Sequence, residues 1–340
     1  MTAAAEADQA VEPSSPPRLW RLRRRARTVG RSVVGLVFAG AVVVTGARLL
    51  VFDAMWPVAI VTVFAPYAAA ASVLVLLGAA LLRMRITLLV ALGLVVVHTL
   101  WMLPRLTADG GPAAGGVRLR VMTSNAYFGT APAERITELA LGERVDVLVV
   151  EELTPELAAD LERTGLTREL PYVAGHGEPG AAGLAIYSRR PLTDDRLLPE
   201  RTTMPMPGAT VEVEGRRIRI QGVHTIPPTR GQAGRWAHDM DALRREAERR
   251  TTPAIFLGDF NATLDNASFR SLTGVGLRDA HEDRGRGLAR TWPMAYFHGL
   301  PPLFGIDHVL VTDGIDVVSI SEHHLPRTDH ATVIANLSIR

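Results

Sequence analysis

The chain of 340 residues contains no cysteine and no lysine. Without cysteine it can form no disulfide, no thiolate metal site and no covalent intermediate on a cysteine nucleophile. This absence leaves the redox compartment undetermined. All 37 basic residues are arginine, and this usage raises the isoelectric point of the chain. We infer no nucleic-acid binding from the isoelectric point.

The net charge of +2 conceals two parts of opposite charge. Residues 1–105 contain 11 arginines and 4 acidic residues, whereas residues 106–340 contain 26 arginines and 31 acidic residues. The first part is therefore basic by about 7 charges and the second acidic by about 5. Residues 1–17 consist mostly of Ala, Glu, Ser and Pro, which bury too little apolar surface to offset the entropy of folding. We expect a disordered, basic cytoplasmic tail over residues 1–28.

Three uncharged hydrophobic runs follow this tail, at residues 32–47, 54–82 and 86–104. A hydrocarbon core about 30 Å thick needs roughly 20 helical residues, so the second and third runs are long enough to cross it. The first run reaches that length if Arg48 lies within the span and extends its charge to the interface. We therefore predict three transmembrane helices within residues 29–105.

Two alternatives fit part of this pattern. An arginine-rich start before the first run also has the shape of a cleaved signal peptide, but two further hydrophobic runs follow it directly. The other two runs also fit buried helices of a soluble protein, although neither run has a polar face. Trp20, Trp56 and Trp101 lie near the ends of the runs, where interfacial aromatic side chains are common. This placement favours the membrane.

The distribution of arginine predicts an orientation. Seven arginines precede the first run, and Arg83 and Arg85 separate the second from the third. Because arginine-rich segments face the cytoplasm, three spans place the C-terminal part outside the cell. We thus expect a multi-pass protein of the cell membrane with an extracellular catalytic domain at residues 117–340. Residues 106–116, rich in Gly, Ala and Pro, are predicted to be a flexible linker.

The pattern of residues 117–340 predicts one α/β domain with its own core. The predicted strands are residues 117–125, 145–150, 183–187, 254–257, 306–311 and 331–337, with a hairpin over 210–223. Thr154 before Pro155 indicates a helix start. A helix predicted over 234–250 has its core face at Trp236, Met240, Leu243 and Ala247. Strands and helices do not alternate strictly, which favours a layered α/β sandwich.

Polar side chains recur at the ends of these predicted strands. The candidates are Asn125, Glu152, His224, Asp259, Asn261, Asp307, Asp329 and His330. Each one alone also fits a structural role, as a turn residue, a solvated charge at a helix start or a strand-end histidine. Their recurrence at strand ends instead suggests one pocket at the edge of a sheet. Asp259 and Asn261 are two residues apart, so in an extended segment both side chains face the same way.

Seven segments carry a resemblance to a known family. NAYFG, VVEEL, GLAIYSRRP, GVHTIPP, LGDFNAT, IDHVLV and TDHATV occur in this order within residues 117–340. They resemble the endonuclease/exonuclease/phosphatase superfamily, which includes DNase-I-like nucleases, apurinic endonucleases, sphingomyelinases and inositol polyphosphate phosphatases. The resemblance implies a four-layer sandwich of two mixed β-sheets flanked by helices. It covers none of the hydrophobic region, so the chain would be a membrane-anchored bacterial member.

The resemblance implies a Mg²⁺-dependent phosphoesterase, with Mn²⁺ as the alternative ion. Mg²⁺ suits such a site because it is a hard ion that binds one or two carboxylates and keeps several waters. Glu152 would be the principal ligand, with Asn125 beside it and Asp329 assisting. The chain departs from the family at Glu151, where Gln is common, and at Thr328, where Ser is usual. The carboxylate of Glu151 could alter metal affinity, whereas Thr328 keeps the hydroxyl.

The remaining roles are also implied by the resemblance. Asp259 would activate or position the attacking water, and Asn261 would hold the phosphate or the water. His330 would contact the scissile phosphate, with Asp307 orienting its ring, because a carboxylate fixes the tautomer of a paired histidine and stabilises the imidazolium. His224 would donate a hydrogen bond to a phosphoryl oxygen.

The sequence leaves the substrate open between a lipid headgroup and a nucleic acid. Proximity to the bilayer favours a lipid phosphodiester, and the acidic balance of residues 106–340 argues mildly against strong DNA affinity. An extracellular nuclease is the first alternative. A catalytically idle binding or sensor domain is the second, although Asp259, Asn261 and His330 are all present. We expect direct attack by water without a covalent intermediate, and we infer no obligate protein partner.

Overall fold

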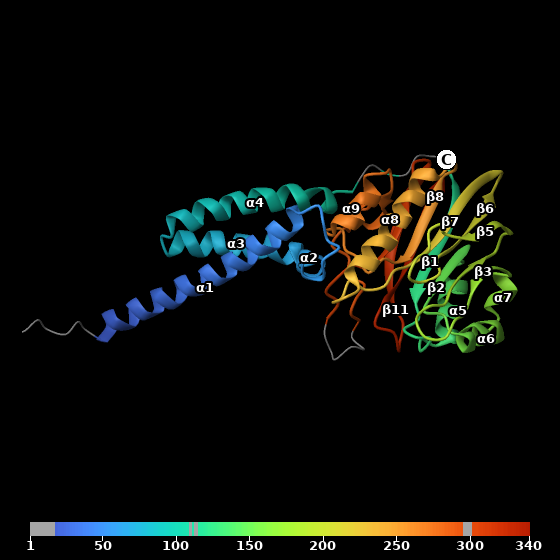
Figure 1. Cartoon of the computed structure of the whole chain (residues 1–340), viewed down its shortest axis with the longest axis horizontal. Helices are drawn as coiled ribbons and strands as arrows, with labels where there is room; N and C mark the ends of the chain where they lie inside the picture. The colour runs from blue at the N-terminus through green and yellow to red at the C-terminus, as the bar shows by residue number, and fades with distance from the viewer. Residues whose placement is uncertain (1–17, 109–110, 112–114, 295–300) are drawn as a thin grey trace, which may run out of the picture.

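The computed structural model describes residues 18–108, 111, 115–294 and 301–340. A group of long helices projects from one side of a layered α/β domain (Figure 1). Residues 1–17 of the predicted tail and residues 109, 110 and 112–114 of the predicted linker lie outside the described residues.

The helical region contains four helices. They are α1 (Arg18–Leu49), α2 (Trp56–Thr62), α3 (Ala65–Leu81) and α4 (Arg85–Leu106). By length and composition α1 and α4 can each cross a membrane, whereas α2 and α3 form a third candidate only as a pair bent by 60°. The break has a local cause, since Pro66 in a continuous helix would clash with the carbonyl of Thr62, the last residue of α2. The structure therefore has two candidate spans, or three with the bent pair.

The arginine-rich segments lie together at the end of the helical region that is remote from the α/β domain (Figure 1). α1 begins at Arg18, so it includes the basic cluster that we expected in a tail; arginine has a high helix propensity. Arg27 and Arg31 donate hydrogen bonds to the carbonyl of Leu82, at 3.4 and 3.0 Å, beside the α3–α4 turn.

The α/β domain contains two mixed six-stranded sheets. The first has the order β11-β12-β1-β2-β4-β3, made of β1 (Val117–Asn125), β2 (Val147–Glu151), β3 (Tyr172–His176), β4 (Leu184–Ser188), β11 (Ile315–His324) and β12 (Ala331–Ile339). The second has the order β5-β6-β7-β8-β10-β9, made of β5 (Leu192–Leu197), β6 (Pro207–Val213), β7 (Arg216–His224), β8 (Ala254–Asp259), β9 (Arg278–Asp279) and β10 (Asp307–Val311). β1 is parallel to β2, and β7 is parallel to β8. The predicted four-layer sandwich is therefore confirmed.

Helices cover the outer face of each sheet. They are α5 (Ala133–Gly142), α6 (Pro155–Arg163), α7 (Leu166–Glu169), α8 (Ala233–Arg249), α9 (Ala267–Thr273) and α10 (Ala280–Asp283). As predicted, Thr154 caps α6 by accepting a hydrogen bond from the amide of Leu157 at 3.2 Å. The predicted core face of α8 is buried against the second sheet, where Trp236 packs with Phe256. A separate apolar core fills the space between the two sheets.

The helical region is docked on the α/β domain through a buried carboxylate. Asp265 binds Arg48 at 2.6 Å and Arg105 at 2.9 Å, and all three side chains are buried. We call these three residues the Asp265 junction. The guanidinium of Arg48 also lies 3.8 Å from the ring centroid of Trp101. The structure thus gives Arg48 a protein partner that the sequence did not predict, a carboxylate distant along the chain.

Further contacts continue this interface. Asp53 accepts hydrogen bonds from the amide of Ser268 at 3.1 Å and from its hydroxyl at 2.6 Å. Asn266 donates to the carbonyl of Ala59 at 3.0 Å. The carbonyl of Arg105, in the last turn of α4, accepts a hydrogen bond from the amide of Gly287 at 2.9 Å. The end of α4 is thus bound to the domain before the predicted linker begins.

Replacement of Asp265 by asparagine is expected to lower the unfolding free energy by about 3 kcal/mol, because it removes the carboxylate that binds two buried guanidinium groups and leaves Arg105 only the more distant carboxylate of Glu282, at 3.7 Å. Thermal unfolding of the full chain in detergent measures this effect. Asp313→Asn is the matched control, since the carboxylate of Asp313 is 95% exposed and pairs with Arg278 at 3.2 Å; it should change stability by less than about 1 kcal/mol. Equal melting temperatures for the two variants would contradict a stabilising junction.

Candidate active site

The eight candidate residues gather at one edge of the two sheets. Asn125 and Asp259 end β1 and β8, and His224 ends β7 in register with Asp259. Asp307 is also paired with Asp259, because β10 runs antiparallel to β8 and begins where β8 ends. The strand ends therefore meet as the sequence predicted.

Asn125 connects the two sheets at this edge. Its Nδ2 lies 3.2 Å from Oδ2 of Asp259, in the second sheet, and 3.3 Å from Oε1 of Glu152, which follows β2 in the first. The amide of Phe128 donates to Oε2 of Glu152 at 2.6 Å. Burial raises the pKa of Glu152, although these two donors oppose the effect.

Asp259 and Asn261 face each other across a turn. The amide of Asn261 donates to Oδ1 of Asp259 at 2.8 Å, and its Nδ2 lies 3.1 Å from Oδ2. Asn261 has φ +47°, so the chain bends here and the extended alternation that we expected does not apply. Gly258 precedes them with φ +147°, and a Cβ at this position would lie 1.9 Å from the carbonyl oxygen of Val223. Only glycine therefore fits this approach of β8 to β7.

His330 and Asp307 form a buried ion pair. Nδ1 of His330 lies 3.0 Å from both carboxylate oxygens of Asp307. Burial acts to lower the pKa of His330, but Asp307 and Asp259 outweigh it and raise this pKa to about 10. The ring is therefore an imidazolium at neutral pH. Nε2 points to the carboxylates, at 3.8 Å from Oδ2 of Asp259 and 3.8 Å from Oδ1 of Asp329.

The hydroxyl of Thr328 links two segments of the site. Its Oγ1 donates to the carbonyl of Asn125 at 2.8 Å and accepts from the amide of His330 at 3.2 Å. This hydroxyl joins the loop before β12 to the end of β1 and so places His330 beside the site.

His224 is a neutral member of the cluster. Its Nε2 lies 3.8 Å from Oε1 of Glu152 and 4.0 Å from Oδ2 of Asp259. Burial lowers its pKa to about 4, and the charge of His330 acts in the same direction. At neutral pH the imidazole is uncharged and can donate one hydrogen bond.

The donor atoms of the site suit a hard divalent cation. Carboxylates outnumber the single imidazolium in the site. Burial raises the pKa of Asp259 to about 7; the charge of His330 opposes this shift, and that of Asp307 adds to it. Oδ1 of Asp329 is buried and has no hydrogen-bond partner within the described residues. A bound cation would offset this excess of negative charge, and oxygen donors favour Mg²⁺ or Mn²⁺.

The compact group of possible ligand atoms differs from the predicted ligand set. One ligand atom from each of Asp259, Asp307 and His330 lies within 4.8 Å of the others. The predicted role of His330 is instead that of a hydrogen-bond donor, and its charged form has no free lone pair for a metal. Asn125 contacts both Glu152 and Asp259, so two of the predicted ligands lie beside this group.

Glu151 lies behind the site. Its side chain is fully buried, and Thr123 donates a hydrogen bond to Oε1. Burial raises its pKa well above the usual range, and the charges of Asp307 and Asp259 add to this shift. Its surroundings therefore disfavour the charged form of Glu151.

Trp292 is a site residue that the sequence analysis missed. Its Nε1 donates to Oδ2 of Asp329 at 2.9 Å. The neighbouring Thr291 accepts hydrogen bonds at Oγ1 from the amides of Ile306 and Asp307, at 3.0 and 3.1 Å. These residues lie in an irregular segment without apolar periodicity, so no pattern identified them.

Comparisons with known proteins address the whole domain. The profile of the Endonuclease/Exonuclease/phosphatase family matches residues 122–330. The chain is similar to an endonuclease/exonuclease/phosphatase from Beutenbergia cavernae DSM 12333, with 20% identity, a TM-score of 0.51, and coverage of 66% of this chain and 72% of that chain. It is also similar to D. rerio TDP2 complexed with single strand DNA product, with 15% identity, a TM-score of 0.54, and coverage of 65% and 99%. At these identities the likeness shows the fold alone. No curated protein matches the chain.

Proposed function

Because the chain belongs to the endonuclease/exonuclease/phosphatase family, we propose that it is a membrane-anchored, Mg²⁺-dependent phosphoesterase that hydrolyses a phosphodiester. The observation that carries this proposal is the contact of Asn125 with both Glu152 and Asp259, which brings the motifs of the two sheets into one site. Members of this family are typically phosphoesterases or nucleases. The presence of all eight polar side chains at one edge argues against a catalytically idle domain.

The proposed ligands are Glu152, Asn125 and Asp329. A divalent cation held there would neutralise charge on the phosphoryl oxygens and stabilise the departing oxygen. The Oδ1 atom of Asp329 supports this assignment, because it is buried and has no hydrogen-bond partner within the described residues.

The other side chains of the site would activate the water and bind the phosphoryl group. Asp259 would accept a proton from the attacking water, while Asn261, fixed by its hydrogen bond to the carbonyl of Thr225 at 2.8 Å, would orient that water. His330 would donate from Nε2 to a phosphoryl oxygen as charge develops there, and Asp307 would hold the ring in place. His224 would supply a second, neutral donor. No side chain in this scheme forms a covalent intermediate.

We further propose that the domain lies outside the cell. The arginines at the remote end of α1 and at the α3–α4 turn support this, because both would then face the cytoplasm. Residues 29–105 would be the membrane region, joined to the catalytic domain by the segment 106–116. Protease treatment of intact cells should remove the catalytic domain, whereas protection on cells and cleavage in inverted vesicles would reverse the topology.

The proposed substrate is a phosphodiester of a lipid headgroup, because the domain is docked on the helices that would cross the bilayer. A nucleic-acid phosphodiester is the second candidate. It is supported by the DNA product in the structure of D. rerio TDP2, which shares the fold.

The deciding experiment uses the purified full chain in lipid vesicles with Mg²⁺ or EDTA. Hydrolysis of bis(p-nitrophenyl) phosphate tests for phosphodiesterase activity without regard to the natural substrate. Release of a lipid headgroup and cleavage of plasmid DNA then distinguish the two classes. We expect metal-dependent headgroup release. Cleavage of DNA alone would favour the nuclease, and no turnover of any of the three substrates would refute the enzyme.

Replacement of Trp292 by phenylalanine should raise the Mg²⁺ concentration needed for half-maximal activity about tenfold, because Asp329 loses the hydrogen bond that orients it. The turnover number at saturating Mg²⁺ should change little. Trp20→Phe is the control, since Trp20 is exposed at the start of α1. A large loss of turnover at all Mg²⁺ concentrations would indicate that Trp292 acts on the substrate instead.

A further inference from the structure

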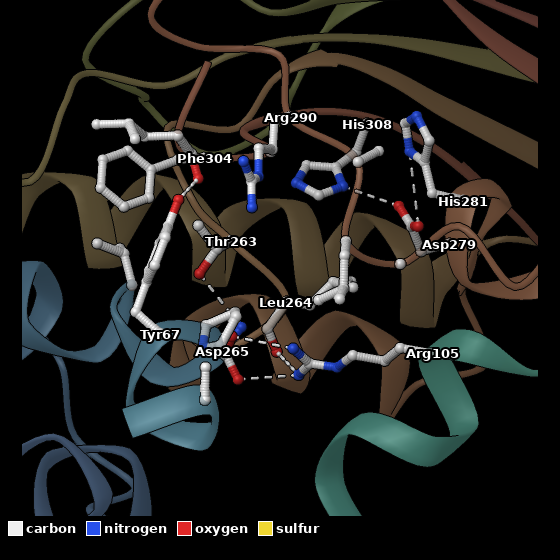
Figure 2. A pocket seen from close by; sticks show the side chains of 18 residues that line it. Tyr67, Arg105, Thr263, Leu264, Asp265, Asp279, His281, Arg290, Phe304 and His308 are labelled. Carbon is white, nitrogen blue, oxygen red and sulfur yellow. Dashed lines mark hydrogen bonds and ion pairs between the residues drawn. The ribbon is translucent and has the colours of Figure 1, made fainter. Parts of the chain in front are cut away.

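A cavity of about 270 Å³ lies where the helical region meets the α/β domain. Figure 2 shows it bordered by Tyr67 of α3 on one side and by Phe304, Arg290 and His308 of the domain on the other. None of the eight candidate catalytic residues lines it. It is therefore a separate site, although its walls continue into the segments that carry Asp307 and Trp292.

One part of the cavity wall is apolar and comes largely from the helices near the α2–α3 break. Val63, Pro66 and Ala70 line it together with Leu303 and Phe304 of the domain. The hydroxyl of Tyr67 also faces this boundary and donates to the carbonyl of Leu303 at 2.6 Å. Since this bond satisfies the hydroxyl, the tyrosine presents mainly its ring to the space.

The charged groups of the wall are paired, with one exception. Arg105 is bound by Asp265 at 2.9 Å. His308 donates from Nδ1 to Asp279 at 2.8 Å and faces the carbonyl of Ala262 with Nε2 at 2.9 Å. Because both partners are acceptors, each ring nitrogen must carry a proton. Burial acts to lower the pKa of His308, but Asp279 outweighs it, so this pKa is raised. In this arrangement His308 donates from both ring nitrogens and has no free lone pair.

Arg290 is the exception. Its guanidinium reaches into the cavity between Phe304 and His308 (Figure 2), and its closest recorded interaction is with the ring of Tyr67, at 5.7 Å from the centroid. No carboxylate or carbonyl within the described part of the chain accepts a hydrogen bond from it. Arg290 is exposed, so its charge is open to solvent. The cavity therefore combines an apolar wall with one arginine that no described carboxylate binds.

We propose that this cavity binds an anionic phospholipid of the surrounding membrane, with its phosphate on Arg290 and the adjoining part of its acyl chain against the wall formed by Val63, Ala70 and Phe304. Two observations select this occupant over a soluble anion. The apolar wall belongs partly to helices near the end where Trp56 and Trp101 lie, which is the level of the lipid headgroups if the helices span the bilayer. A cavity of this size with one cationic group suits a lipid headgroup and a short length of chain.

The site differs from the proposed catalytic function, since it requires binding and no turnover. Its test is native mass spectrometry of the full chain in detergent, titrated with phosphatidylglycerol or phosphatidylcholine of identical chains. We expect preferential retention of phosphatidylglycerol by the wild type. Arg290→Gln should weaken its binding about tenfold, which is the effect of losing one charge-assisted hydrogen bond. Arg216→Gln, on the exposed β6–β7 hairpin and outside the cavity, should bind as the wild type.

A second variant tests the apolar part without changing charge. Ala70→Phe adds bulk to the wall from α3 and should also weaken phosphatidylglycerol binding, while circular dichroism and melting temperature report whether the fold is kept. Soluble glycerophosphate should compete poorly, because it lacks the chain. Unchanged lipid binding in a folded Arg290→Gln protein would overturn the proposal, as would equal binding of both lipids. Equally tight binding of glycerophosphate would show a soluble-anion site instead.

Discussion

Replacement of Asp259 by asparagine is expected to lower kcat for phosphodiester hydrolysis by about 10³-fold, because asparagine keeps the shape of the side chain but cannot accept the proton of the attacking water. Two neighbours of Asp259 cannot take over this role. Asn261, the residue hydrogen-bonded to Asp259, is an amide, and His330 is already protonated at neutral pH. The turnover number of the full chain, measured with bis(p-nitrophenyl) phosphate at saturating Mg²⁺, tests this expectation.

The control for this variant is Asp195→Asn. Asp195 is an exposed residue of β5, and loss of its charge should leave kcat within about twofold of the wild type. Asp259 also lies beside the proposed metal ligands, so Mg²⁺ binding must be measured separately by calorimetry. Asp259→Asn protein that binds Mg²⁺ and retains more than a tenth of the wild-type turnover would contradict the role of Asp259 as the base.

Replacement of His330 by alanine is expected to lower kcat by about 10²–10³-fold, because a preorganised cationic donor to the phosphoryl group is lost. Asp307→Asn should have a smaller but still large effect, since asparagine leaves His330 without the carboxylate that binds Nδ1 at 3.0 Å. The two residues act as one unit in this scheme. The double variant should therefore be about as impaired as His330→Ala alone.

The comparison of single and double variants provides the decisive measurement. Multiplicative losses would show that Asp307 acts independently of His330, for example directly on the metal. His238→Ala is a suitable control, because His238 is exposed on α8 and lies outside the eight candidate residues. It should leave both stability and turnover nearly unchanged.

The sequence was a good guide where local rules decide the structure. Alternation predicted β1, and the apolar run over residues 145–150 predicted β2. The cap at Thr154 and the core face of α8 were confirmed as well. The candidate residues at the strand ends meet because parallel neighbours such as β7 and β8 end at the same edge.

Features that depend on distant partners were not predictable. β11 was missed because it alternates imperfectly: a register shift between Val317 and Ser319 interrupts its pairing with β12. Trp292 was missed because only the fold brings its indole to Asp329. The partnership of Arg48 with Asp265 joins residues that are far apart in the chain, so the hydropathy around Arg48 gave no indication of it.

The Asp265 junction has a kinetic consequence. It binds the last turn of α1 and the last turn of α4 to one carboxylate, so the catalytic domain is fixed to the helical region at two points close to the proposed membrane surface. An enzyme held in this way would reach only substrates in a thin layer at the membrane, whereas a flexibly tethered domain would reach substrates in a larger volume. Its substrate supply would then be set by surface density in two dimensions, and dilution of the membrane with an inert lipid would slow it at constant bulk substrate concentration.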